Sequence, residues 1–81
     1  MSHEVKLPLS EYVMITVQRY FDHLEGDLPK DLHALVLMEV EKGLFKVVME
    51  RARGNQCLAS KMLGLARNTL RSKLEKYQLF D

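Results

Sequence analysis

The chain has 81 residues, of which 47% are apolar, so it can form one small domain with a modest core. Its single cysteine, Cys57, cannot form an internal disulfide, and polar residues interrupt the first eight positions, unlike a signal peptide or membrane span. We therefore expect a soluble, cytoplasmic protein that makes no contact with a membrane.

The formal net charge of +1 conceals a division of charge along the chain. Up to Glu50, five basic residues stand against nine acidic ones, which gives −4; from Arg51 onward, seven stand against two, which gives +5. A basic C-terminal part of this kind could face the phosphates of a nucleic acid. A solvated basic helix face explains the same pattern equally well.

A first helix is predicted to begin at about Ser10, a good N-cap residue, and to continue to Glu25, with Gly26 placed to end it. Its apolar residues lie on or near one stripe, which is typical of a helix that faces a core. They are Leu9, Val13, Val17, Tyr20, Phe21 and Leu24.

A second, longer helix is predicted to begin near Asp27 or Leu28, to tolerate Pro29 in its first turn and to continue to about Arg51. Its apolar residues fall on nearly every side, so it needs burial all round. They are Leu32, Leu35, Val36, Leu37, Met38, Val40, Leu44, Phe45, Val47, Val48 and Met49. A second copy of the chain is the economical cover; the alternative is burial within a monomer. Gly43 is expected to introduce a kink.

Two short helices joined by a glycine turn are predicted after Gly54. Asn55 is suited to cap a helix over residues 56–63, Gly64 to form a left-handed turn, and a last helix follows over residues 67–77. Small Ala59 and Ser60 would let helices cross, and the internal packing would come from Leu63, Leu65, Leu70 and Leu74. Side chains that bond to phosphates and base edges face outward: Arg67, Asn68, Thr69, Arg71, Ser72, Lys73 and Lys76. These features favour a DNA-binding helix-turn-helix over a generic helical hairpin.

The segment RGNQCLASKMLGLARNTLRSKLEKY resembles the C-terminal signature of the Fis family, in which GN, a small pair, LG and R-x-TL-x-x-KL-x-x-Y recur. The similarity extends over about residues 7–77. It implies an all-α protein of four helices whose first two form an intertwined homodimer core. It further implies a nucleoid-associated dimer that binds and bends double-stranded DNA in transcription, recombination or chromosome organisation. Residues 1–8 would then be a short tail and residues 9–81 one domain, with dimerisation helices in 9–53 and the helix-turn-helix in 54–77.

The resemblance also assigns roles to individual residues. Arg67 matches the family's base-contacting arginine, and the positions that match DNA contacts, chiefly to the backbone, are Asn55, Thr69, Arg71, Lys73 and Lys76. Arg53, Gly54 and Gln56 match a patch through which the family touches RNA polymerase; plain turn chemistry is the alternative there.

Departures from the family pattern bear on the strength of DNA binding. Ala66 stands where the family has an asparagine that caps the recognition helix and approaches a base. Leu58, Ser72 and Glu75 replace basic residues, which thins the charge that faces phosphates. A helical homodimer that acts through protein contacts, with a weakened helix-turn-helix, is therefore the alternative function.

Other chemistry has little support in the sequence. The spacing of His3, His23 and His33 makes no helical metal pair, while Glu39 and Glu41 point to different sides of a helix and are expected to be solvated. No phosphate-binding glycine loop or nucleophile motif is present in the sequence. We expect no enzyme activity, cofactor, metal or small-molecule substrate.

The last expectation concerns the segment before the first helix. Fis proteins that stimulate DNA inversion carry a β-hairpin arm there, and residues 1–8 are too few for two strands and a turn. The sequence thus predicts binding and bending of DNA without activation of an invertase.

Overall fold

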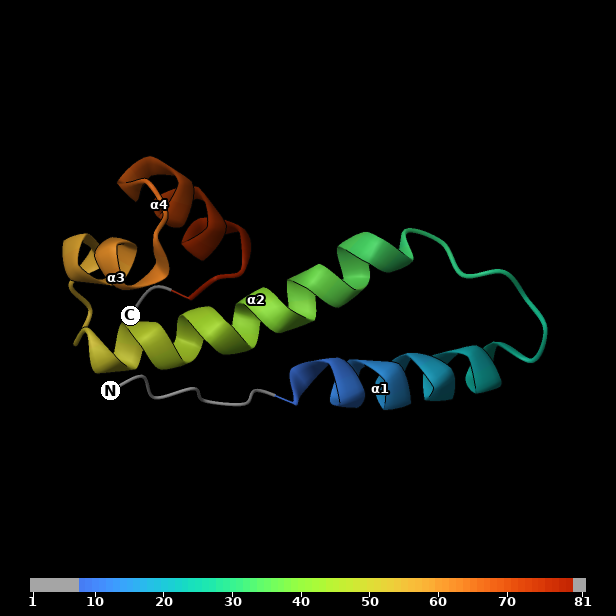
Figure 1. The fold of residues 1–81 in the computed structure, drawn as a ribbon. Coiled ribbons are helices and arrows are strands. Elements are labelled where there is room, and N and C mark those ends of the chain that lie inside the picture. The colour runs from blue at the N-terminus through green and yellow to red at the C-terminus, as the bar shows by residue number, and fades with distance from the viewer. Residues whose placement is uncertain (1–7, 80–81) are drawn as a thin grey trace. The chain divides into compact units, whose positions relative to one another are not determined.

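The computed structural model describes residues 8–79, and these residues form four helices and no strand (Figure 1). The helices are α1 (Leu9–Leu24), α2 (Leu32–Arg51), α3 (Gln56–Leu63) and α4 (Arg67–Lys76). The predicted all-α fold with a C-terminal helix-turn-helix is confirmed.

The expectation about an N-terminal arm falls on residues 1–7, which lie outside the described residues. The chain divides into two compact units between Asp31 and Leu32, and each unit is described by itself.

The first unit is built on α1, whose ends differ slightly from the prediction. The helix begins after Pro8, whose carbonyl accepts from the N–H groups of Glu11 and Tyr12, so Ser10 lies within the first turn and is not the N-cap. At the other end Glu25 adopts a left-handed conformation (φ 51°) and ends the helix one residue early. No residue of α1 is buried, and the large apolar side chains exposed on it are Leu9, Tyr12, Met14, Ile15 and Phe21.

The predicted start of α2 near Asp27 or Leu28 is wrong, because the helix begins at Leu32. Proline disfavours helical geometry in the residue before it, so Leu28 is not expected to be helical, although Pro29 itself is compatible with a first helical turn. Asp31 has a positive φ of 52°, which also prevents continuation into α2. The predicted end at Arg51 is confirmed.

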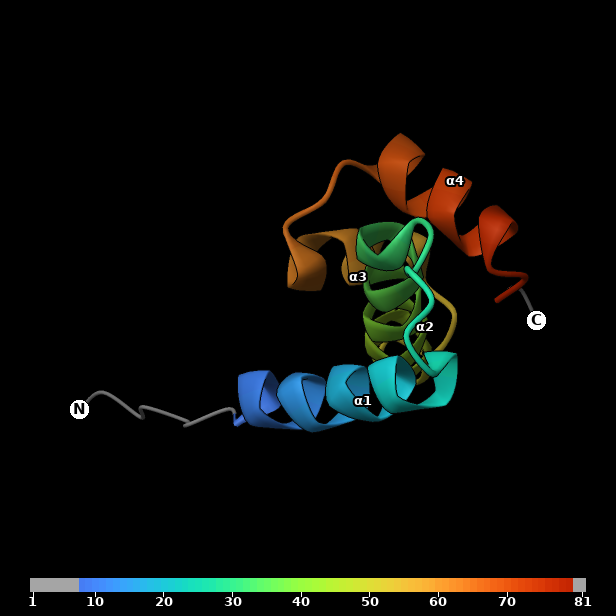
Figure 2. The same ribbon diagram turned by 90° about the vertical axis from the view of Figure 1, so that its right-hand side faces the viewer.

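The second unit has a core made by the C-terminal half of α2 together with α3 and α4. Both short helices lie above α2 in Figure 1, and in Figure 2, which looks along α2, α4 lies above it and α3 to one side. The buried apolar residues are Phe45, Ala52, Ala59, Leu70 and Leu74, and Val48, Met49, Leu63, Leu65, Tyr77 and Leu79 pack against them. Ala59 and Ser60 are buried as small residues at the helix crossing, as predicted.

The rest of the α2 surface is left uncovered within the single chain. Phe45 is the only buried residue of this helix. Leu37, Leu44 and Val47 are each close to half exposed. A Cβ added at Gly43 would meet no heavy atom within 4 Å. Close packing within the single chain therefore does not require a glycine at this position. The kink at Gly43 stays a prediction.

Candidate nucleic-acid interface

Asn55 starts the helix-turn-helix by capping α3. Its backbone is extended (φ −80°, ψ 102°), and its side-chain oxygen Oδ1 accepts a hydrogen bond from the N–H of Leu58 at 3.1 Å. This bond satisfies one of the N–H groups that the first turn of a helix leaves free, so the predicted cap is confirmed. Asn55 is also exposed, so it can meet a ligand from the position that the cap fixes.

The turn between α3 and α4 depends on a left-handed glycine. Gly64 has a φ of 72°, and its N–H and that of Leu65 both donate to the carbonyl of Ser60, at 2.9 and 3.1 Å. Glycine adopts this conformation without the steric cost that a Cβ brings. Leu65 then packs against the buried core, which fixes the direction in which the chain enters α4.

The helix α4 begins without a side-chain cap. Ala66 has the extended backbone of an N-cap residue (φ −64°, ψ 147°), but its side chain makes no hydrogen bond to the first turn. The lack of a side-chain cap that the sequence indicates at this position is therefore confirmed, and the loss of a base contact stays a prediction. The first N–H groups of α4 are consequently not satisfied by residue 66.

One side of α4 is buried and the remaining surface is polar. Leu70 and Leu74 are fully buried. The exposed residues of the helix are Arg67, Asn68, Thr69, Arg71, Ser72, Glu75 and Lys76. The structure thus brings four of the six predicted DNA-contacting residues, Arg67, Thr69, Arg71 and Lys76, onto the exposed surface of one short helix.

Lys73 does not belong to that exposed surface. Its ammonium Nζ lies 2.9 and 3.0 Å from the two carboxylate oxygens of Glu41, and its side chain is only 32% exposed. Glu41 also accepts a hydrogen bond from the hydroxyl of Tyr77. The expectation that Glu41 is solvated is wrong, because this part of α2 faces the C-terminal end of α4, where Lys73 and Tyr77 supply both donors.

The protonation equilibria of Glu41 and Tyr77 follow from these contacts. The Tyr77 hydroxyl, and then the Lys73 ammonium, stabilise the carboxylate and lower the pKa of Glu41 below its usual value of 4.5, although partial burial opposes this. The same hydrogen bond holds the proton on Tyr77 and raises the pKa of its phenol above 10.0. Glu41 is therefore ionised, and Tyr77 neutral, at physiological pH.

Arg53 and Gly54 close the C-terminal end of α2. Both have positive φ angles, 54° and 79°. The N–H of Gly54 donates to the carbonyl of Met49 at 3.0 Å, and that of Arg53 to Glu50 at 3.1 Å, which is the hydrogen-bond pattern of a Schellman motif. Turn chemistry therefore accounts for the backbone of this patch, and Gln56 follows as the first, partly buried residue of α3.

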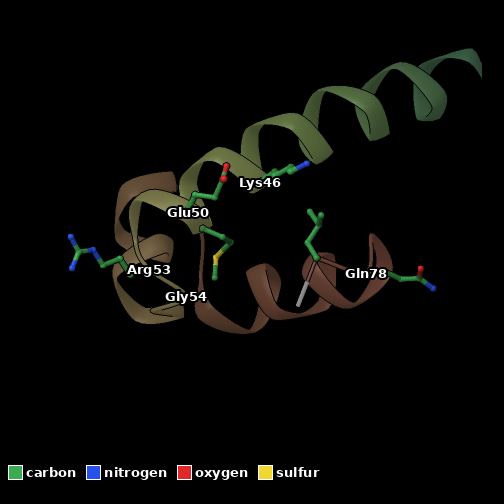
Figure 3. Close-up of a pocket in the computed structure, with 7 residues that line it drawn as sticks. Lys46, Glu50, Arg53, Gly54 and Gln78 are labelled. Carbon is green, nitrogen blue, oxygen red and sulfur yellow. The ribbon is translucent and has the colours of Figure 1, made fainter. Parts of the chain in front are cut away.

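A shallow hollow lies beside this turn, between the C-terminal part of α2 and the chain after α4 (Figure 3). It is lined by Lys46, Met49, Glu50, Arg53, Gly54, Gln78 and Leu79. The guanidinium of Arg53 and the amide of Gln78 point away from it (Figure 3). The polar groups of these two residues therefore do not converge within the hollow.

Two further observations apply to the part of the chain that the structure describes. Among residues 8–79, no group of histidine, cysteine and acidic side chains is arranged to hold a metal ion. No helix among them has the length and apolar character needed to cross a membrane.

These elements define the class of the protein. Two short helices joined by a left-handed glycine turn, with an exposed polar face on the second, form a helix-turn-helix that is carried here on a long supporting helix.

Comparison with known proteins gives the family. The family described as bacterial regulatory protein, Fis family, matches residues 36–77. The DNA-binding protein Fis of Glaesserella parasuis is 45% identical over 76 residues, which cover 94% of this chain and 78% of the relative. The same protein of Mannheimia haemolytica is 42% identical over the same shares, and that of Actinobacillus succinogenes is 49% identical over 86% of this chain and 71% of the relative. The chain belongs to the Fis family.

Proposed function

We propose that this protein is a nucleoid-associated regulator that binds and bends double-stranded DNA as a homodimer, in transcription, recombination or chromosome organisation. The observation that carries the proposal is α4, which is anchored by the buried Leu70 and Leu74 and presents basic and hydroxyl side chains to solvent. Such side chains bond to phosphates and to base edges in a major groove. The relatives at 42–49% identity are named DNA-binding proteins, which supports the same role here.

Each exposed residue has a proposed part in binding. Arg67, at the start of α4, contacts a base edge, because an arginine can donate two hydrogen bonds to guanine. Thr69, Arg71 and Lys76 contact phosphates, and Asn55 does so from the start of α3. Lys73 is a separate case, because its ammonium is already bonded to Glu41.

The homodimer is supported by the apolar surface that the single chain leaves uncovered. No residue of α1 is buried, and on α2 the side chains of Leu37, Leu44 and Val47 remain about half exposed. A second copy related by a two-fold axis would cover these surfaces. Light scattering at micromolar concentration should give twice the mass of the chain, and a folded monomer would refute the dimer.

A contact with RNA polymerase is proposed for the turn at Arg53, Gly54 and Gln56. The support is that Arg53 keeps a left-handed backbone that costs free energy in any residue other than glycine, while its exposed guanidinium points into solvent. With these partners, the proposed location of the protein is the cytoplasm, on the nucleoid.

A second candidate function is a helical dimer that acts through protein contacts alone. The observation that favours it is the surface of the helix-turn-helix at Leu58, Ser72 and Glu75, where exposed residues carry no positive charge and one is acidic. Fewer cations facing phosphates release fewer counterions and lower the affinity.

A gel-shift series distinguishes the two functions. The protein is titrated against A·T-rich and G·C-rich duplexes of equal length at two salt concentrations. A DNA-binding protein should retard both at low salt and lose affinity as salt rises. Because bending narrows the minor groove at the centre of a site, replacing only the central A·T pairs by G·C should weaken binding. Failure to retard either duplex at low salt would leave the protein-contact function.

A further inference from the structure

We propose that Glu41 is a positioning residue for the DNA-binding helix: it holds α4 against α2 through Lys73 and Tyr77, and Lys73 therefore acts inside the protein and not on a phosphate. The inference rests on the proposed DNA binding, within which it assigns the role of Glu41. It also changes the role that the family resemblance implies for Lys73.

Two pairs of side chains, one from each helix, meet at this point. On α2, Glu41 and Phe45 are four residues apart and share a face; at the end of α4, Lys73 and the C-cap residue Tyr77 are also four residues apart. Glu41 accepts hydrogen bonds from the Lys73 ammonium and the Tyr77 hydroxyl. The Phe45 and Tyr77 rings pack with their centroids 6.2 Å apart. The C-terminal end of α4 is thus held by polar and aromatic contacts together.

These contacts add a directional constraint to the apolar packing of α4. Leu70 and Leu74 anchor the helix through burial, which has no preferred direction. Hydrogen bonds to a carboxylate are directional and, with Glu41 only 25% exposed, they are less screened than bonds in open solvent. Burial of Leu70 and Leu74 sets the rotation of α4 about its axis coarsely, and the directional Glu41 contacts fix it at the C-terminal end, whereas the N-terminal end has no side-chain cap. That rotation determines the direction in which the Arg67 and Arg71 side chains point from α4.

Lys73 and Lys76 differ in the partner that each ammonium has. The Lys73 ammonium donates hydrogen bonds to both carboxylate oxygens of Glu41. Contact with a phosphate would require breaking this ion pair. Lys76 forms no ion pair with a carboxylate among residues 8–79; its ammonium lies 5.6 Å from the centre of the Tyr77 ring and the residue is exposed. Lys76 is therefore the matched control for a lysine that contacts DNA directly.

The first test is the salt dependence of DNA affinity in Lys73→Gln and Lys76→Gln, measured on one duplex with an A·T-rich centre. Lys76→Gln should lower the slope of log affinity against log salt by about 0.9 for each symmetric contact, or about two for the dimer. Lys73→Gln should weaken binding with the slope unchanged. A drop in slope equal to that of Lys76→Gln would overturn the proposal.

The second test exchanges the charges. Lys73→Glu alone should lower affinity about tenfold or more, and adding Glu41→Lys should recover most of the loss, because a lysine at position 41 can donate to the new carboxylate and to the Tyr77 oxygen. Lys76→Glu should show no recovery with Glu41→Lys. A double variant no tighter than Lys73→Glu would overturn the proposal.

Circular dichroism separates loss of folding from loss of positioning in both tests. If Lys73→Glu alone unfolds, the double variant should regain both its helical signal and its DNA affinity, and recovery of the helical signal without affinity would count against the positioning role. Wild-type protein that retards no duplex would refute the proposed function and, with it, the role of Glu41. That result is distinct from loss of rescue, which affects only the variants.

Discussion

The uncapped start of α4 allows a prediction in which stability and DNA affinity separate. Ala66 already has the backbone conformation of an N-cap residue, so a side chain that accepts a hydrogen bond can be added without moving the chain. An N-cap serine or asparagine in place of alanine is worth about 1 kcal/mol. For a domain of this size, that gain corresponds to a rise in Tm of about 4–8 °C.

The assay is a thermal melt of Ala66→Ser and Ala66→Asn by circular dichroism at one fixed protein concentration, because the Tm of a dimer depends on concentration. Both variants should gain the same stability, while only the asparagine, whose amide resembles the family's base contact, should also tighten DNA binding. Asn55→Ala is the control, since it removes the cap that α3 does have and should lose about 1 kcal/mol. No gain in Tm for either variant would show that water already satisfies the first turn of α4 as well as a side chain can.

Three further outcomes are expected. The folded protein lowers the pKa of Glu41, so the carboxylate stabilises the fold fully above about pH 4.5 and loses this effect as the pH falls through the folded pKa. The folded protein raises the pKa of Tyr77, so the neutral phenol stabilises the fold fully below pH 10.0 and loses this effect as the pH rises through the folded pKa. Urea denaturation across pH should therefore be flatter at both limits in Glu41→Gln than in the wild type, and identical profiles would contradict the contact. Arg67→Ala should cost about 1–3 kcal/mol of binding and relax specificity at one base of each half-site, measured by selection from random duplexes; an unchanged sequence preference would exclude a base contact. Arg53→Gly should raise the stability by about 1 kcal/mol, since glycine adopts a φ of 54° without steric cost, yet weaken capture of RNA polymerase in a pull-down, and a loss of stability would refute strain at this residue.

The helices whose ends are set by local chemistry could be predicted from the sequence. Asn55 and Gly64 bound α3 in the structure at the residues that the sequence indicates, because a side-chain cap and a left-handed glycine act within a few residues of themselves. The start of α2 was not predictable in the same way. Pro29 is compatible with a first helical turn, and only the left-handed backbone at Asp31 shows that the helix begins later.

The contact between Glu41 and Lys73 could not be predicted from spacing, since the two residues are 32 positions apart. A partial signal was nevertheless present. Lys73 lies three residues after Leu70 and four before Tyr77, which places it beside the buried side of α4 and not on the outward face. In the same way Glu41 shares a face of α2 with Phe45. Helical position thus indicates that both residues lie near the core, whereas their pairing depends on how α2 and α4 meet.

The buried core of Phe45, Leu70 and Leu74 does not include Leu37, Leu44 and Val47, the exposed apolar residues of α2 that we assign to the proposed second copy. A chain whose α4 has lost its DNA contacts would therefore still assemble with an intact one. In a cell that makes both, each mixed dimer would carry only one intact DNA-binding helix. The altered chain would therefore lower the DNA binding of the normal chain. The separation of assembly from recognition makes this protein susceptible to dominant-negative alleles, and these should cluster on the exposed face of α4.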